Sequence, residues 1–215
     1  MPDTQWPLFD LRVRTPRLEI RLPTDPDLYR LNELVDLGVH EQSAMPFTIP
    51  WTDTPTPRRH RESLRFWWSA RADWSPESWN FTGAVFVDGT PVGVQDLMAK
   101  NFARLRTVET ASWLGRQHQG QGLGKEMRAA ILHLAFEGLG AIRAISGAFH
   151  DNGASLATSK SLGYTGNGDR LMLRRERPDR ILDLKLDRVT WTRRDDIEIE
   201  GLEACLEMFG VMPPD

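Results

Sequence analysis

The chain has one cysteine, no long apolar run and almost no net charge. Its single cysteine, Cys205, has no partner for an intramolecular disulfide, and the N-terminal residues lack the basic-then-apolar order of a signal peptide. We therefore expect a reducing, cytoplasmic setting. No stretch approaches the roughly 20 apolar residues of a membrane-spanning helix. Lysine and arginine number 27 against 30 aspartates and glutamates, so no overall basic field exists to attract a nucleic acid or an anionic membrane, and we expect neither as a partner.

Metal-binding and nucleic-acid-binding patterns are equally scarce. The histidines, at positions 40, 60, 118, 133 and 150, show no H-x-x-x-H spacing, and one cysteine cannot build a thiolate site, so we expect no metal. Only the run from Arg58 to Arg61 favours nucleic-acid binding. The tryptophans at 67, 68, 74 and 79 are better explained as packing groups than as a surface for stacked bases.

The chain has the length of one sizeable domain. It holds 215 residues, of which 40% are hydrophobic, enough to bury a core. No internal repeat or long low-complexity linker divides it, and the proline-rich stretch 52–57 is short enough to be a surface loop. We expect a single domain over residues 1–215, with a short C-terminal extension from about residue 188.

Hydrophobic periodicity predicts a mixed α/β architecture. In 17–22, for example, Leu18, Ile20 and Leu22 alternate with charged residues, as in a half-buried strand. The predicted strands are 17–22, 81–87, 92–99, 107–114, 141–149, 170–175 and 181–186. The predicted helices are 28–39, 56–72, 123–137 and 152–162. A strand-helix-strand unit within a largely antiparallel set indicates a mixed sheet with helices on its faces.

The C-terminal tail shows helical spacing. In the segment 197–215, Leu202, Cys205, Leu206 and Phe209 recur at helical spacing among several glutamates. We expect an amphipathic helix here, which packs either on its own domain or in a subunit interface.

A glycine-rich turn stands between the strand ending near Leu114 and the helix over 123–137. Successive N–H groups without large side chains, followed by a helix N-terminus, form an anion site suited to a pyrophosphate. The Walker A pattern fails, because Gln119 replaces its first glycine and Glu126 follows Lys125. The dinucleotide pattern G-x-G-x-x-G fails as well, because Lys125 or Met127 occupies its last position. Neither a P-loop nor an NAD site is therefore expected.

The turn does match Q-x-x-G-x-G, with Gln119, Gly122 and Gly124, and here the sequence resembles the GNAT superfamily of acyl-CoA-dependent N-acyltransferases. Other landmarks resemble its branch of RimJ/RimL ribosomal-protein acetyltransferases: the opening 15–18, the strand 112–116, the N-x-x-S helix start 151–155 and the closing L-G-Y at 162–164. Segments 6–11, 45–47 and 50–51 are similar to a smaller bacterial group of GNAT N-succinyltransferases.

The resemblance implies a mixed, mostly antiparallel seven-stranded sheet whose central strands splay apart to accept the pantetheine arm of acyl-CoA. It also implies a set of cofactor-binding residues: Trp113, Leu114, Gln119, Gly120, Gln121, Gly122, Leu123, Gly124, Lys125, Asn152 and Ser155. In that set a backbone N–H near Trp113 or Leu114 polarises the thioester carbonyl. Helix-surface cations at 125, 128 and 160 either reach the phosphates or are simply solvated.

Two residues are implied in catalysis. Glu109 is the first candidate for the base that deprotonates the amine, against the alternative of a solvated surface group. Ser155 is the candidate hydrogen-bond donor to the departing thiolate, against the alternative of an ordinary helix residue. Many relatives use a tyrosine where this sequence has Ser159, and the alternative is a reaction that depends mainly on positioning the amine beside the thioester.

We therefore expect an enzyme that transfers a small acyl group, succinyl in preference to acetyl, from acyl-CoA to a primary amine of a small molecule or protein. The alternatives are an acetyl-CoA-dependent N-terminal acetyltransferase of the ribosomal-protein type and a non-catalytic acyl-CoA-binding module. Cations available for a succinyl carboxylate are Lys100, Arg104, Arg116 and His118. The segment 40–60 is expected to form a wall of the acceptor site, and the protein is expected to be a homodimer or higher oligomer.

Overall fold

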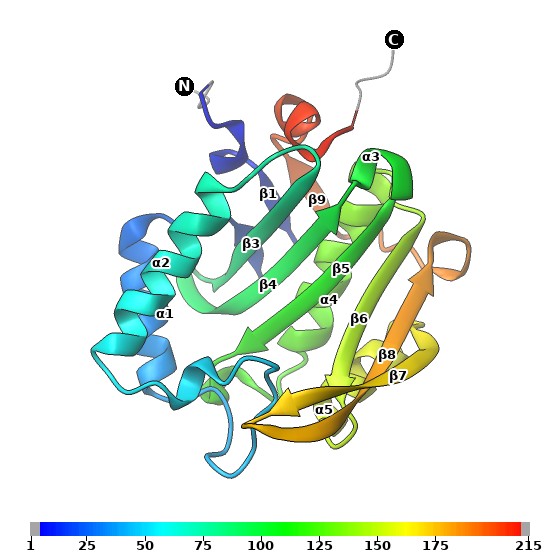
Figure 1. The fold of residues 1–215 in the computed structure, drawn as a ribbon. Helices are drawn as coiled ribbons and strands as arrows, with labels where there is room; N and C mark the ends of the chain where they lie inside the picture. Colours follow the sequence, from blue (N-terminus) through cyan, green and yellow to red (C-terminus); the bar gives the residue numbers. More distant parts are fainter. Residues whose placement is uncertain (1–4, 212–215) are drawn as a thin grey trace.

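The strands form one mixed sheet in the computed structural model, which describes residues 5–211. The sheet has nine strands in the order β7-β8-β6-β5-β4-β3-β2-β1-β9, and every neighbouring pair is antiparallel except β5 and β6. The strands are β1 Arg12–Arg14, β2 Glu19–Arg21, β3 Ser78–Val87, β4 Thr90–Lys100, β5 Thr107–Leu114, β6 Arg143–Phe149, β7 Thr165–Arg174, β8 Arg177–Asp187 and β9 Glu198–Glu200. The predicted mixed, mostly antiparallel sheet is confirmed (Figure 1).

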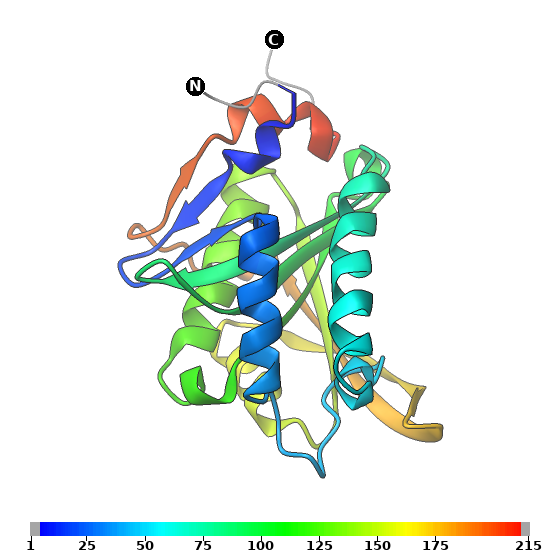
Figure 2. The same cartoon turned by 90° about the vertical axis from the view of Figure 1, so that its left-hand side faces the viewer.

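Helices cover both faces of this sheet. They are α1 Asp25–Asp36, α2 Arg58–Ala72, α3 Phe102–Leu105, α4 Leu123–His133 and α5 Gly153–Ser161. Figure 2 shows α2 and α4 on opposite sides of the strands. On the α1/α2 side, Leu31 and Trp67 pack in one apolar cluster with Val94 of β4. The larger core lies on the other side, where the apolar face of α4 is almost wholly buried.

Local sequence explains where these helices begin and end. Thr24 accepts a hydrogen bond from the Asp27 N–H while the Asp27 carboxylate accepts one from the Thr24 N–H, a capping box that starts α1. The predicted helix over 123–137 is present as α4 followed by a π-helical turn, Leu134–Gly138, and Gly140 follows with a φ of 70°. A left-handed residue of this kind cannot continue the helix.

Two short strands were missing from the predicted set of seven. β1 pairs with β2 and with β9, placing Val13 beside Ile20 and Ile199. Each of these strands has only three residues, with one apolar residue between charged ones, so periodicity alone is too brief to reveal them. The arginine Arg14 pairs with Glu200 across the β1–β9 ladder, a contact that joins residues far apart in sequence.

The expectation of a C-terminal amphipathic helix was wrong for the described part of the tail; residues 212–215 lie outside the described residues. The chain forms β9 and then two 3-10 turns, Glu203–Cys205 and Glu207–Phe209. Phe209 is fully buried against Trp74 and Trp79, with ring centroids 5.3 and 4.9 Å away. The Trp79 indole donates to the Phe209 carbonyl at 3.2 Å, and Gly210 adopts a φ of 69°. Packing on the chain's own core therefore decides the conformation of the tail.

Candidate functional site

The central strands β5 and β6 part halfway along their length. They pair only at Thr107↔Arg143, Val108↔Ala144 and Glu109↔Ile145. Beyond this point β5 pairs only with β4 and β6 only with β8, and Figure 1 shows the two strands diverging. We call the facing edges 110–114 and 146–149 the splay. Backbone groups along the splay are released from the ladder and can bind another molecule.

The β4–β5 ladder determines which N–H groups face the splay. In an antiparallel pair the N–H groups of successive residues point to opposite sides. Gly115 N–H donates to the Val92 carbonyl of β4 at 3.0 Å, so alternation directs the N–H of Trp113 to β4 and the N–H of Leu114 toward the splay. Of the two residues proposed to polarise a thioester carbonyl, Leu114 has the suitable orientation.

The glycine-rich turn follows β5 directly and presents open backbone. Gly120 and Gly122 have φ values of 72° and 80°, which glycine adopts without strain. No side chain caps the first turn of α4, whose N-cap residue is Gly122. A Cβ atom at Gly120 would meet nothing within 4 Å, and one at Gly124 would meet only Leu114 Cδ1 at 3.8 Å. The turn therefore has both the exposed donors and the room that a pyrophosphate requires.

Gln119 has a structural position in this turn. Its side-chain amide donates to the Leu114 carbonyl at 2.9 Å and to the Val39 carbonyl at 2.7 Å. The Gln121 side chain similarly donates to the Gln117 carbonyl at 2.8 Å. These bonds hold the turn against the end of β5, so the predicted contribution of Gln119 to cofactor binding is indirect.

Arg17 lies beside the same turn and was noted in the sequence only as part of an opening motif. Its guanidinium donates to the Gln121 carbonyl at 3.1 Å and to the Glu126 carboxylate at 2.6 Å, and its side chain is 51% exposed. Burial by itself raises the pKa of Glu126, but hydrogen bonds from Thr15 and Arg17 reverse this and hold the pKa below its ordinary value. Arg17 therefore adds positive charge next to the turn while neutralising Glu126.

The start of α5 follows β6 at the open end of the splay. The Asn152 side-chain oxygen accepts from the Ser155 N–H at 3.2 Å and so caps the helix. This leaves the Asn152 amide N–H groups as donors for a ligand. Ser155 is half-buried, whereas Ser159 is fully buried and its hydroxyl makes no hydrogen bond with any residue between 5 and 211. Ser155 is therefore the better placed of the two serines.

A second set of side chains gathers on the α1/α2 side of β5. Glu109 is exposed there, at the last pair before the splay. Trp113 lies on the same face, with its ring 5.9 Å from that of Trp51, which in turn lies 5.0 Å from Phe47. The segment 40–53 thus forms a wall beside the end of β5. That the segment 40–60 forms a wall of the acceptor site stays a prediction.

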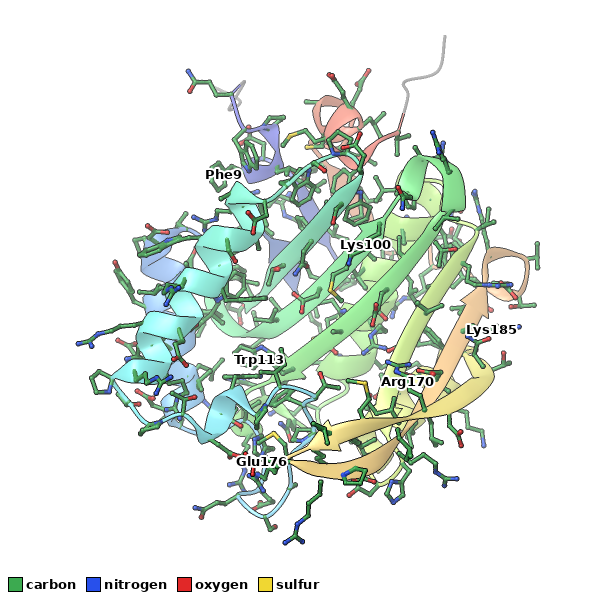
Figure 3. The ribbon with its side chains drawn as sticks, viewed as in Figure 1. Phe9, Lys100, Trp113, Arg170, Glu176 and Lys185 are labelled. Carbon is green, nitrogen blue, oxygen red and sulfur yellow. The ribbon has the colours of Figure 1, made fainter. Side chains whose placement is uncertain are left out.

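The β7–β8 turn holds this wall in place. Arg175 pairs with the Asp53 carboxylate at 2.7 and 2.8 Å, and Arg174 donates to the Met45 carbonyl at 2.7 Å. The hydrogen bond from Arg175 keeps the pKa of Asp53 below its ordinary value. Figure 3 shows the neighbouring Glu176 at the tip of the hairpin, next to this loop.

Asp96 is a carboxylate near the site that the sequence analysis missed. It lies on β4 opposite Ala111 of β5, and its Oδ1 is buried without a hydrogen bond to any described residue. Burial raises the pKa of Asp96 to about 7, against a smaller lowering influence from Thr82. Asp96 is the single charged residue in the predicted strand 92–99, and this was the available signal. A base with this pKa is half-ionised near neutral pH.

Three of the four cations proposed for an acyl carboxylate have other surroundings. Arg116 pairs with Glu41. Lys100 and the exposed Arg104 lie at the end of the β4–β5 pair that is far from Trp113, as Figure 3 shows for Lys100. Lys100 and Arg104 therefore lie away from the splay, and the Arg116 guanidinium is engaged by Glu41.

The basic run 58–61 is engaged in ion pairs. Within the basic run at the start of α2, Arg58 pairs with Glu62, and Arg59 and His60 pair with Asp36. Among residues 5–211, no group of three or more His, Cys, Asp or Glu side chains is arranged to hold a metal ion. No helix in that range is long and apolar enough to cross a membrane.

Comparisons with known proteins agree with this geometry. Residues 17–165 match the acetyltransferase (GNAT) domain family. RimL, a ribosomal L7/L12 alpha-N-protein acetyltransferase solved with coenzyme A, has a TM-score of 0.65 and 16% identity, over 80% of this chain and 95% of that one. Mycobacterium smegmatis RimJ in complex with CoA-disulfide has a TM-score of 0.66 and 17% identity, over 84% and 88%. A chimera of the Vibrio cholerae spermidine N-acetyltransferase SpeG has a TM-score of 0.64 and 14% identity, over 83% and 99%. At these identities the structures share the fold.

Proposed function

Because this chain belongs to the GNAT acetyltransferase family and is an acyl-CoA-dependent acyltransferase, we propose that it transfers a small acyl group, succinyl in preference to acetyl, to a primary amine. The observation that carries the proposal is the adjacency of the splay and the glycine-rich turn. One supplies free backbone groups for an extended pantetheine, and the other supplies donors for a pyrophosphate.

The residues that hold acyl-CoA follow from this arrangement. The N–H groups of residues 121–125 bind the pyrophosphate. Arg17, which contacts the Gln121 carbonyl, and Lys125, in the first turn of α4, add positive charge. The Leu114 N–H donates to the thioester carbonyl oxygen, and the Asn152 amide donates to pantetheine. When bound, the thioester supplies an acyl carbonyl that an amine can attack.

Three side chains are assigned to proton transfer and to stabilising the departing sulfur. Glu109, exposed on the acceptor side of β5, accepts the proton of the attacking amine. Asp96, one strand away on the same face, is a second carboxylate able to take that proton near neutral pH. Ser155 donates a hydrogen bond to the sulfur as it departs, because its hydroxyl lies half-exposed in the first turn of α5.

The succinyl preference rests on segments that resemble GNAT N-succinyltransferases. Two of them, 45–47 and 50–51, fall in the wall beside Trp113, where they would contact the acceptor and the acyl group. The competing proposal, acetylation of a protein N-terminus, draws on the similarity of fold to RimL and RimJ.

Steady-state thiol release tests the function and its donor. With one amine acceptor from a panel of small amines and peptides, we expect a higher kcat/KM for succinyl-CoA than for acetyl-CoA. Glu109→Gln should lower kcat by roughly 100-fold or more while leaving CoA affinity nearly unchanged. Equal or better use of acetyl-CoA contradicts the succinyl preference. Binding of CoA without thiol release across the whole panel favours a non-catalytic module instead.

A further inference from the structure

A buried arginine lies where β5 and β6 part. Arg128 projects from α4 and is only 3% exposed. It donates to Ser112 Oγ of β5 at 2.9 Å, to Ser146 Oγ of β6 at 3.5 Å and to Gln95 Oε1 of β4 at 3.4 Å. Its guanidinium thus spans the three strands around the closed end of the splay.

All of these partners are uncharged. Arg128 forms no ion pair with any carboxylate among residues 5–211, although Glu126 on the same helix is paired with Arg17. The bonds to Gln95 and Ser146 lie at the outer limit of a useful length, and the Tyr164 hydroxyl is a further uncharged hydrogen-bonding partner. A buried cation is costly unless an opposite charge compensates it. The guanidinium therefore retains the capacity to bind an anion that the described residues do not supply.

Arg128 lies apart from the proposed phosphate donors. Its side chain enters the sheet beneath Ser112, whereas the proposed phosphate donors are the exposed N–H groups at the start of α4. Ser112 lies two residues before Leu114, whose N–H faces the splay and is proposed to hold the thioester carbonyl. The guanidinium therefore lies nearer the paired end of β5 and β6 than the N–H proposed to hold the thioester carbonyl.

We propose that Arg128 binds a carboxylate at the far end of the donor's acyl chain and thereby selects succinyl-CoA over donors with an uncharged acyl group. A succinyl group carries its carboxylate two methylene groups beyond the thioester carbonyl, and a guanidinium binds a carboxylate through two parallel N–H groups. This inference rests on the proposed acyl-CoA site and names the residue that distinguishes a succinyl donor from a donor with an uncharged acyl group.

Binding measurements distinguish a role for Arg128 in binding the acyl carboxylate from a role in holding pantetheine. Calorimetric titration compares succinyl-CoA, butyryl-CoA and CoA itself, since butyryl has the same carbon chain length without the carboxylate. We expect the wild type to bind succinyl-CoA at least about tenfold more tightly than butyryl-CoA. In Arg128→Met this preference should vanish while butyryl-CoA and CoA affinities change little. Arg104→Met, on the exposed α3, is the matched control and should retain the full preference.

Equal binding of succinyl-CoA and butyryl-CoA by the wild type overturns the proposal. So does a loss of affinity in Arg128→Met that is the same for all three ligands, which assigns the arginine to pantetheine or to the fold. If Arg128→Met does not fold, Arg128→Lys carries the test, because lysine lacks the planar pair of donors. A reduced preference then supports the proposal, and an unchanged one overturns it. Since no turnover is measured, failure to acylate any amine contradicts the proposed function separately.

Discussion

Asp96 illustrates the energetic consequences of a single buried carboxylate. Its pKa of about 7 in the folded protein exceeds the ordinary 3.8, so between these pH values the folded state keeps a proton that the unfolded chain releases. Stability therefore falls as pH rises from about 4 to 7 and stays reduced above that range. We expect Asp96→Asn to raise the free energy of unfolding by about 1–3 kcal/mol at pH 8 and by almost nothing at pH 3.5.

Urea unfolding at the two pH values measures this difference. Asp88→Asn, at the exposed β3–β4 turn, is a matched control that should change stability little at either pH. An equal effect of Asp96→Asn at both pH values would show that burial does not perturb this carboxylate. A carboxylate that lowers stability and lies beside the proposed acceptor site is consistent with a functional role.

Gly124 allows a charge to be placed in the turn without straining the fold. A side chain there makes only ordinary contact with Leu114, and an aspartate near a helix N-terminus is favourable by itself. We expect Gly124→Asp to weaken CoA binding by at least about tenfold through repulsion of the pyrophosphate. Calorimetric titration measures the affinity, and Gly124→Ala controls for steric effects. Wild-type affinity in a folded Gly124→Asp protein would contradict the assignment of the turn as the pyrophosphate-binding site.

Residues of the turn were predictable because their chemistry is local. Gly120 and Gly122 adopt positive φ values, and the tolerance of such values is a property of glycine itself. Asp96 and Arg128 were not predictable in the same way. Their burial arises when strands from separate parts of the chain assemble around them, and helix spacing alone left Arg128 as a surface cation.

At the scale of elements, the β7–β8 turn fixes the wall segment through one ion pair. Arg175→Met removes the pairing with Asp53, and we expect it to raise the KM for the amine several-fold with a smaller effect on the KM for acyl-CoA. Arg177→Met is the matched control, because Arg177 is exposed on the same hairpin and forms no ion pair within residues 5–211. Equal changes in both KM values would place the wall away from the acceptor.

Elements with a clear period were predicted from the sequence, and those governed by distant partners were not. The hairpin of β3 and β4 has two apolar runs around the Asp88-Gly89 turn, and α4 has apolar residues at helical spacing. β1 and β9 are stabilised by pairing with each other. The tail has helical apolar spacing but forms 3-10 turns, which place Phe209 against two tryptophans. Tertiary packing overrode the local preference in that segment.

For the whole molecule, the buried tail predicts that the chain unfolds as one unit. Phe209 joins the aromatic cluster on Trp79 and Phe81, so Phe209→Ala should lower the free energy of unfolding by about 3–5 kcal/mol within a single cooperative transition. Met208→Ala, at a partly buried neighbour, should cost less. Circular dichroism and tryptophan fluorescence followed together in urea test this. Two separate transitions would instead indicate an independently folding C-terminal extension.

That the protein forms a homo-oligomer stays a prediction, which light scattering can test.

Acyl transfer itself is tested most directly by identifying the product. The purified protein is incubated with succinyl-CoA or acetyl-CoA and a panel of small amines and peptides, and mass spectrometry is used to look for acylated amines together with free CoA. The splay, the glycine-rich turn and the acceptor face of β5 predict an N-acylated product that forms only with active protein and is strongly reduced in Glu109→Gln. Intact donor and unmodified amines throughout the panel, from a folded protein that binds CoA, would contradict the account.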